Sequence, residues 1–218
     1  MSDMILYSLP HSPYAARVRL MLKLKSIDAQ IVAPLGGLGS EQFKALTPTG
    51  KVPALQVGEL NLPESIAIME FLEERFSDYP TLRGSDLERA WNRSASRFID
   101  LGLAPALFPL FAQLQANPKD KALIANSLAE LKKQVAVLAQ FVERAPGELL
   151  DAKSPGFFDC VLAPVMFYVT TVAPLFGDTG ILDSQDGLAA WWAEIQQHEQ
   201  VSVLLEEMRA GLAAMMGS

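Results

Sequence analysis

The amino-acid sequence predicts a small α/β unit followed by an all-α unit. In the first 76 residues, short apolar runs of strand length alternate with segments whose apolar residues recur every three to four positions. Their order is strand, helix, strand, helix, strand, strand, helix. After residue 85 the pattern is helical, and the residues between contain Tyr79-Pro80 and Gly84, a composition typical of linkers. We therefore predict a domain over residues 1–78, a linker over 79–86 and a helical domain over 87–218.

Composition and charge exclude several classes of function. The chain has 218 residues, half of them hydrophobic, which is enough for a substantial core. Its formal net charge of −7 argues against a nucleic-acid partner, because such proteins normally present a basic face or stripe. The single cysteine, Cys160, excludes an internal disulfide and a C-x-x-C pair. The two distant histidines, His11 and His198, argue against a metal site.

The distribution of apolar residues also bears on location. We find no basic segment followed by a long apolar run at the N-terminus, and no stretch near the roughly 18 apolar residues of a membrane span. We therefore expect a cytoplasmic protein that has no membrane partner.

The N-terminal domain is predicted to begin with a strand, a turn and a capped helix. Residues 4–9, MILYSL, have the character of a short buried strand, and two nearby prolines require a turn after it. Ser12 is a favourable N-cap and Pro13 suits the first helical position, so a helix runs from there to about residue 25. A strand at 30–32, a glycine-rich loop at 36–39 and a short helix at 40–46 follow. The loop lacks the G-x-x-x-x-G-K-[ST] pattern of a phosphate-binding loop.

The helical half is predicted from apolar stripes and prolines. Residues 87–103 carry apolar positions 87, 91, 95, 98 and 101 on one side and Arg89, Arg93 and Arg97 on another. Pro105 and Pro109 are expected to bend or break this helix. Asn117-Pro118 is interpreted as an N-cap and a first helical position that start a helix to about residue 142. Its expected stripe comprises Ile124, Leu128, Leu131, Val135 and Leu138.

Residues 157–172, FFDCVLAPVMFYVTTV, are apolar all round except for Asp159, which predicts a helix in the centre of a bundle. If this helix begins near Gly156, Asp159 falls at its third position. A carboxylate there accepts hydrogen bonds from free backbone N–H groups, so we assign Asp159 a structural role. Further helices are expected over residues 187–198 and 201–215.

Residues 50–57, GKVPALQV, contain the first element of a candidate binding site. A proline at the start of a strand has no N–H for the sheet, so Pro53 is expected at an edge or a sharp turn, where a cis peptide bond is also found. The N–H and C=O of Val52 would then be free to pair with an extended peptide. The ligand predicted by this geometry is short and peptidic.

The second element is the helix that Pro63-Glu64-Ser65 opens, with an expected apolar stripe of Ile66, Met69, Leu72 and Phe76. Its N-terminus combines free N–H groups, the positive dipole end, a hydroxyl and a carboxylate. Glu64 suits an α-ammonium group, and the N–H and hydroxyl of Ser65 suit an α-carboxylate. A zwitterionic head beside a strand-like peptide points to glutathione.

These residues carry a family resemblance. The motif K-V-P-A-L followed by E-S-I-A-I-x-x-F-L-E-E-R-F resembles the glutathione-site half of the cytosolic glutathione transferases, most strongly over the first 78 residues. The resemblance implies a thioredoxin-like N-terminal domain, glutathione as co-substrate, a role in detoxification and a homodimer. Members usually have Ser or Thr three residues before the aspartate that matches Asp159. This chain has Gly156, a weaker N-cap.

The resemblance also implies a serine-type site, because S-P-Y-A-A-R-V-R is similar to versions in which the residue before Pro-Phe or Pro-Tyr activates the thiol. A thiol must ionise to become a nucleophile, and a hydroxyl at a helix N-terminus stabilises the thiolate. We therefore predict Ser12 as the catalytic residue, although a serine at this place by itself is more often only a cap. Tyr7, inside the first strand, is assigned to the core.

The remaining predicted site residues surround the ligand. Lys51 is a candidate for the glycyl carboxylate of glutathione, beside Val52 and Pro53. The second substrate, a small hydrophobic electrophile, is expected over the sulfur and against the helical domain. Its predicted walls are Leu9, His11, Leu103, Leu107, Phe108, Phe111 and Phe167.

Two alternatives stay open. The S-x-x-x-x-R-V-R frame also resembles the maleylacetoacetate isomerase branch, but Tyr14 stands where that branch has the cysteine of its Ser-Ser-Cys motif. We place the isomerase below the transferase. A non-catalytic regulatory or assembly subunit of the same fold is the other alternative. The presence of all five predicted glutathione-site residue types argues against it; they are Ser12, Lys51, Val52, Glu64 and Ser65.

Overall fold

A computed structural model describes residues 4–217. These residues divide into two compact units: one contains residues 4–81 and 199–217, and the other contains Leu82–His198. The C-terminal helix is thus grouped with the sheet, whereas the sequence pattern had assigned all residues after 86 to the helical domain. The pattern of residues within the last helix does not show which of the two units it packs against, because that depends on the surface that it covers.

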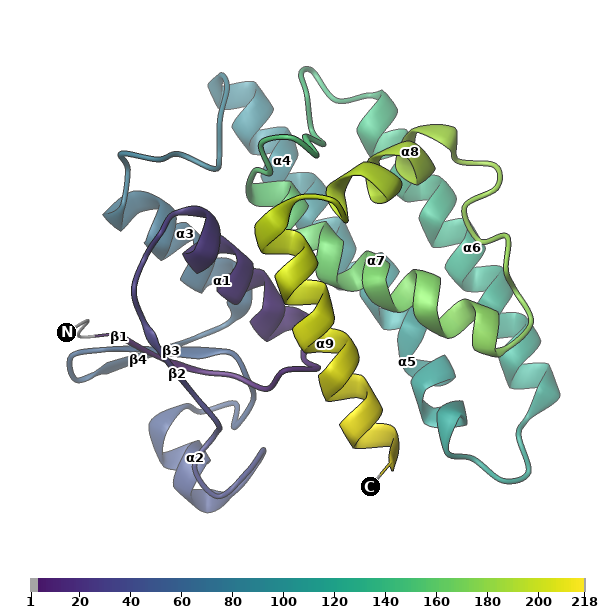
Figure 1. Ribbon diagram of the computed structural model, residues 1–218, viewed down its shortest axis with the longest axis horizontal. Helices are drawn as coiled ribbons and strands as arrows, with labels where there is room; N and C mark the ends of the chain where they lie inside the picture. Colours follow the sequence, from purple (N-terminus) through teal and green to yellow (C-terminus); the bar gives the residue numbers. More distant parts are fainter. Residues whose placement is uncertain (1–3, 218) are drawn as a thin grey trace. The chain divides into compact units, whose positions relative to one another are not determined.

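The first unit contains a mixed four-stranded sheet in the order β2-β1-β3-β4 (Figure 1). Its strands are β1 (Met4–Tyr7), β2 (Gln30–Val32), β3 (Ala54–Val57) and β4 (Leu60–Pro63). β2 runs parallel to β1, whereas β3 pairs antiparallel with both β1 and β4. This sheet and the helices around it confirm the predicted α/β, thioredoxin-like class.

Pro53 lies at a sharp turn, one of the two places that the sequence predicted for it. The predicted cis Val52–Pro53 peptide bond is present, whereas the following strand, β3, is interior and not an edge of the sheet. Pro53 lies one residue before the strand begins, and its missing N–H therefore removes no hydrogen bond from the ladder.

Helices cover both faces of this sheet (Figure 1). They are α1 (Pro13–Leu24), α3 (Ser65–Arg75) and, on the opposite face, α2 (Glu41–Leu46). Ser12 caps α1 by accepting from the Ala15 N–H at 3.2 Å, as predicted. The core beneath α2 is a cluster of Tyr7, Phe43 and Ala54. Tyr7 therefore belongs to the core, as the sequence predicted.

The buried stripe of α3 differs from the predicted one. Ile68, Met69 and Leu72 are fully buried, whereas Ile66 and Phe76 are only half-buried. The helix starts at Ser65, and positions three, four and seven residues later therefore share its inward face.

Glu73 anchors the chain after α3. Its carboxylate accepts from the Lys25 ammonium at 2.9 Å and from the backbone N–H and hydroxyl of Thr81 at 2.8 and 2.7 Å. The Lys25 ammonium also donates to the Tyr79 carbonyl at 2.6 Å. This network ties the end of α1 to the segment where the unit ends.

The second unit begins with a continuous helical rod. It consists of α4 (Asp86–Phe98), one π-helical turn, η1 (Ile99–Leu103), and α5 (Ala104–Leu114). The prolines do not break it: Pro105 directly follows the π turn, and Pro109 lies inside α5. Of the predicted stripe, Ala95 is buried, but Leu101 is exposed because it lies in the π turn, which changes the helical phase. Leu87, in the first turn of α4, is exposed as well.

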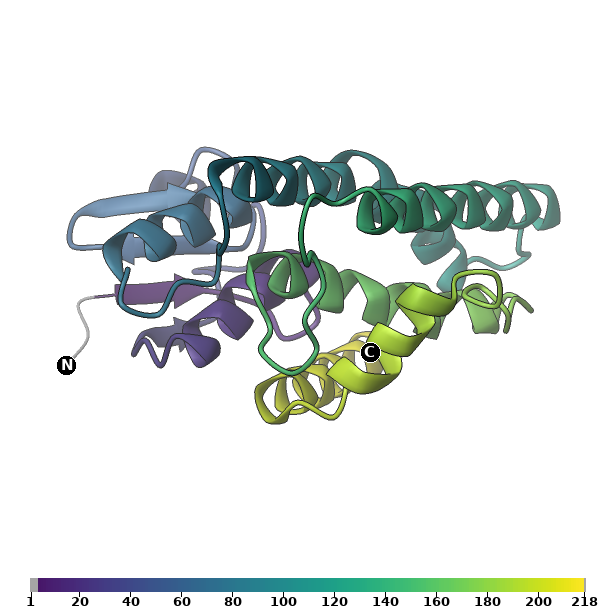
Figure 2. The same ribbon diagram turned by 90° about the horizontal axis from the view of Figure 1, so that it is seen from above.

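The next helix, α6 (Lys121–Glu143), packs along this rod (Figure 2). The predicted start at Asn117-Pro118 is wrong: that peptide bond is cis and precedes the helix, and Asp120 is the N-cap, accepting from the Leu123 N–H at 2.9 Å. Aspartate and asparagine are nearly equal as N-caps, so the local sequence did not separate them.

The core helix of the second unit is α7 (Phe157–Leu175), which is followed by α8 (Asp186–Ile195). Asp159 is buried and accepts from the Gly156 N–H at 2.8 Å, from the Trp191 indole N–H at 2.8 Å and from the Asp151 N–H at 3.2 Å. The predicted structural role is confirmed, and the carboxylate also joins α7 to α8. The remaining helix, α9 (Glu199–Gly217), belongs to the first unit.

Two helical segments are long and apolar enough to cross a membrane by length and composition alone, Asp86–Leu114 and α7. This corrects the expectation that no stretch approaches such a length. In α7, 78% of the most apolar window is buried inside the structure, which fits its position as a core helix.

Asp159 should make the stability of the helical unit depend on pH. Burial raises its pKa to about 7, although the bonds from Gly156, Trp191 and Asp151 oppose this shift. A carboxyl group whose pKa is raised by folding stabilises the fold fully below its unfolded pKa, and this contribution is lost as pH rises through the folded pKa. Relative to Asp159→Asn, the wild-type unfolding free energy should fall by up to about 4 kcal/mol between about pH 4 and pH 7.

Urea unfolding at a series of pH values, followed by tryptophan fluorescence, measures this difference. Asp186→Asn makes the same exchange at the exposed start of α8 and is the matched control. A difference between wild type and Asp159→Asn that stays constant with pH would contradict the assignment.

Candidate functional site

The sheet register brings three predicted site segments to one end of the sheet. Tyr7 pairs with Ala54, and Ala54 pairs with Pro63, so these residues form one row across β1, β3 and β4. Because β3 is antiparallel to both neighbours, the turn after β1, the turn before β3 and the start of α3 all leave the sheet at this end. They carry Ser12, Val52 and Glu64-Ser65, respectively.

The Ser12 hydroxyl is available to a ligand. Its oxygen accepts from the Ala15 N–H, and among the described residues it donates to no other group. The side chain is half-buried at the N-terminus of α1, where free N–H groups and the dipole favour negative charge. A hydroxyl in this place can donate to an anionic sulfur.

The N-terminus of α3, formed by Glu64 and Ser65, differs from that of α1 because no side chain caps it. Glu64 is the N-cap of α3 with φ +70°, a conformation that non-glycine residues rarely adopt. Its side chain does not cap the helix, and within residues 4–217 its exposed carboxylate has no partner. The N–H of Ser65 likewise makes no backbone hydrogen bond in this part of the chain. A strained backbone that leaves polar groups unpaired is a frequent property of binding sites.

A buried arginine that the sequence interpretation missed supports this N-terminus. Arg17 is fully buried, donates to the Ser65 hydroxyl oxygen at 3.4 Å, and lies 4.8 Å from the centre of the Tyr14 ring. Because this bond uses a lone pair of the oxygen, the Ser65 hydroxyl proton stays available for an acceptor. Arg17 also links α1 to the start of α3.

Arg19, one helical position further along, orders the turn before Ser12. Its guanidinium donates to the carbonyls of Leu9 and Pro10 at 3.3 and 2.8 Å and to the Ser8 hydroxyl at 3.4 Å. Burial, and secondarily the charge of Arg19, lower the pKa of His11. The signal for both arginines was in the sequence: charged residues on a helix whose other residues are almost all apolar.

Val52 and Lys51 complete the first half of the site. The backbone N–H and C=O of Val52 make no hydrogen bond with any described residue, as strand addition by a peptide requires. Lys51 is exposed, and its ammonium has no partner within residues 4–217. Behind it, Gly39 donates to the Gly50 carbonyl at 2.9 Å, so the glycine loop supports this turn.

The residues predicted to line the second substrate fall into both units and are described separately. Leu9 and His11 are half-buried in the turn of the first unit. In the second unit, Phe108 is 51% exposed and Phe111 is half-buried. The other three have 3% exposure or less, which favours a core role; they are Leu103, Leu107 and Phe167. The set as a whole stays a prediction.

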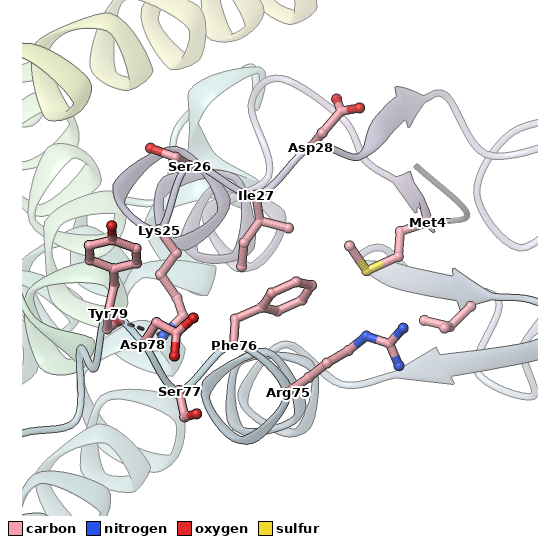
Figure 3. Close-up of a pocket in the computed structure, with 11 residues that line it drawn as sticks. Met4, Lys25, Ser26, Ile27, Asp28, Arg75, Phe76, Ser77, Asp78 and Tyr79 are labelled. Carbon is pink, nitrogen blue, oxygen red and sulfur yellow. Dashed lines mark hydrogen bonds between the residues drawn. The ribbon is translucent and has the colours of Figure 1, made fainter. Parts of the chain in front are cut away.

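A hollow of the first unit has another location. It has a volume of about 580 Å³ and lies at the opposite end of the sheet, near Met4 and Val57 (Figure 3). Lys25, Arg75 and Phe76 also line it. None of the predicted site residues does, so we do not assign the site to this hollow. No group of three or more His, Cys, Asp or Glu side chains within residues 4–217 is arranged to hold a metal ion.

Several known proteins are similar to this chain in sequence and in fold. Residues 6–80 match the glutathione S-transferase N-terminal domain. Glutathione S-transferase Z2 of Arabidopsis thaliana is 30% identical over 168 residues, covering 73% of this chain and 73% of that protein. Maleylacetoacetate isomerase of Mus musculus is 38% identical over 107 residues, covering 46% and 49%, respectively. A solved structure of glutathione S-transferase I bound with the ligand lactoylglutathione has a TM-score of 0.76 at 22% identity. It covers 94% of this chain and 99% of that chain, and shows the same fold.

The strain at Glu64 leads to a prediction about stability. Glycine adopts positive φ without steric cost, so Glu64→Gly should raise the free energy of unfolding by about 1 kcal/mol. Glu64→Ala removes the same carboxylate but keeps a Cβ, and is therefore the matched control that should show no gain. Equal stability of the two variants in urea unfolding would show that the backbone at this position is not strained.

Proposed function

Because the chain belongs to the glutathione S-transferase family of enzymes, we propose that its Ser12 hydroxyl stabilises the thiolate of bound glutathione for attack on a hydrophobic electrophile. The observation that carries this proposal is the sheet register, which places the Ser12 turn, the free backbone of Val52 and the uncapped start of α3 at one end of the sheet. The attack forms a sulfur–carbon bond, by addition or by displacement of a leaving group.

The two ends of glutathione have separate partners in this proposal. Glu64 accepts from the γ-glutamyl ammonium, and the N–H and hydroxyl of Ser65 donate to its carboxylate. Val52 pairs with the peptide backbone of the ligand after the cis bond to Pro53, and Lys51 binds the glycyl carboxylate. The free carboxylate of Glu64 and the free backbone groups of Val52 support this placement.

The Ser12 hydroxyl and the dipole of α1 can together supply the free energy needed to lower the pKa of the glutathione thiol. A free thiol has a pKa of about 8.5, and lowering it by about 2 units requires about 2.7 kcal/mol. One hydrogen bond to a charged group contributes about 1.5–3 kcal/mol and the helix dipole about 0.3–1 kcal/mol. Ser12 and the N-terminus of α1 therefore suffice without a separate general base.

A second candidate function uses the same thiolate. Maleylacetoacetate isomerase of Mus musculus is similar to about half of this chain, which favours a glutathione-dependent cis–trans isomerisation as the alternative. Tyr14 stands where that branch has a cysteine, so we place transfer above isomerisation. A non-catalytic regulatory role is the third possibility. Turnover across a panel of electrophiles and maleylacetoacetate separates the three.

We further propose a cytoplasmic, homodimeric protein with a role in detoxification. The arginine edge of α4 offers a surface for the partner. The acidic residues expected to meet it lie within residues 70–74. Glu73 of this segment already binds Lys25 and Thr81 within its own unit, and Glu74 is exposed.

Substitution of Ser12 should mainly lower the rate of the reaction, whereas substitution of Glu64 should mainly lower the affinity for glutathione. Ser12→Ala should bind glutathione nearly as well as wild type, but the pKa of the bound thiol should rise and the rate at neutral pH should fall about ten- to a hundredfold. Glu64→Ala should lose about 1.5–3 kcal/mol of affinity, because the ligand ammonium loses its charged partner. Calorimetry and the thiolate absorbance of the complex against pH measure the two effects.

Ser12→Cys extends the test, since a cysteine there should shift activity toward disulfide exchange. If Ser12→Ala has the titration curve and rates of wild type, Ser12 is only a helix cap. Unchanged affinity in a folded Glu64→Ala variant would refute the proposed position of the ligand's head.

The dimer proposal predicts a mass of about twice the 23.8 kDa of one chain in light scattering at micromolar concentration. Arg97→Glu, on the exposed edge of α4, should weaken association because it puts like charges opposite each other. Lys121→Glu makes the same change of charge at the start of α6 and should leave the mass unchanged. A wild-type monomer under these conditions would contradict the proposal.

A further inference from the structure

Gly211 occupies an unusual place in α9. Its neighbours, in the run RAGLAAMM, are good helix formers, whereas glycine is one of the least favourable residues in a helix interior. A glycine in such a position often marks a place where another backbone approaches closely. In this chain that backbone is the turn that precedes Ser12.

The approach leaves no room for a side chain at this position. A Cβ atom on Gly211 would lie 2.8 Å from the backbone nitrogen of His11 and 2.8 Å from the Cβ of Pro10. The next residue of the turn is Ser12, the N-cap of α1. The helix therefore touches the turn one residue away from the predicted catalytic hydroxyl.

A second contact, one helical turn earlier, joins the same two segments. Glu207 accepts from the Lys23 ammonium at 3.1 Å, and its other oxygen lies 3.7 Å from the Nε of Arg19. Arg19 is almost fully buried and donates to the carbonyls of Leu9 and Pro10. Glu207 is thus connected through Arg19 to the backbone that Gly211 touches directly.

We propose that α9 is a positioning element of the thiol-activating turn. Gly211 sets how closely the helix and the turn approach, and Glu207 fixes the Arg19 side chain that holds the turn carbonyls. The effect on the glutathione thiol rests on the proposed function, whereas the contacts of Gly211 and Glu207 with the turn and with Arg19 do not. Neither Gly211 nor Glu207 is a catalytic residue, because both act through the position of Ser12.

Gly211→Ala tests this inference in the full-length chain. The added methyl group should push the turn away from α9, weaken the hydrogen bond from Ser12 to the sulfur and raise the pKa of bound glutathione by about half a unit or more. From the pKa of about 6.5 that the proposed function requires, a rise of half a unit lowers the thiolate fraction at pH 7 from about 0.76 to about 0.5. Glutathione affinity should stay within about twofold of wild type, since the atoms nearest to Gly211 belong to Pro10 and His11 and not to Val52, Glu64 or Ser65. Gly217→Ala, on the same helix with open space around it, is the matched control.

A second readout does not depend on glutathione. The chain has two histidines, so the imidazole of His11 can be followed by NMR beside His198 as an internal reference. Displacement of the turn should expose His11 and raise its lowered pKa toward the ordinary value. Glu207→Gln removes a negative charge beside Arg19, which alone would lower the His11 pKa, so a rise of that pKa in this variant reports displacement of the turn. Glu206→Gln, whose carboxylate pairs with the exposed Arg209, should produce no such rise.

The outcomes separate this inference from the proposed function. If Gly211→Ala changes the His11 titration while neither it nor Ser12→Ala changes the thiol, the positioning of the turn stands and the role of Ser12 fails. If Gly211→Ala leaves both His11 and the thiol as in wild type, the inference is overturned. If Gly211→Ala does not fold, Glu207→Gln decides, and a His11 pKa that does not rise in that variant overturns the inference.

Discussion

The pairing of β3 with both β1 and β4 is the constraint on which the site depends. Antiparallel registers align Tyr7, Ala54 and Pro63 in one row, and this row brings together three turns that are distant in sequence. A slip of one residue in either pairing would turn the buried side chains of β3 to the other face of the sheet, so the core fixes the register. The hydrophobic packing of Leu55 on one face and Ala54 on the other thereby determines where Ser12 and Glu64 stand relative to each other.

The two helix N-termini at this end of the sheet have different properties, and the difference suits different groups of a ligand. α1 is capped by Ser12, whose hydroxyl proton remains, whereas α3 has no side-chain cap and keeps its free N–H groups. A hydroxyl donor suits a sulfur anion, and free backbone N–H groups suit a carboxylate. Two buried arginines on α1 lie behind these termini, Arg17 bound to Ser65 and Arg19 bound to the turn before Ser12.

Local chemistry made part of this arrangement predictable from sequence. Ser12-Pro13 specifies a helix start, Val52-Pro53 specifies a turn, and the apolar run around Asp159 specifies a core helix, because each signal lies within a few residues. The interior position of β3, the inward face of α3 and the return of α9 depend on which surfaces pack together, and no local pattern contains that information. Asn117-Pro118 was misinterpreted because Asp120, three residues later, is an equally good cap. Arg17, Arg19 and Gly211 had visible signals, since each contradicts the character of its own helix.

A crystal structure of the protein grown with glutathione would locate the ligand directly. We expect the sulfur within hydrogen-bond distance of the Ser12 hydroxyl, the γ-glutamyl carboxylate at the N-terminus of α3 and the ligand backbone paired with Val52. A tripeptide bound elsewhere, or bound here with its sulfur turned away from Ser12 and toward His11 or Tyr14, would contradict it.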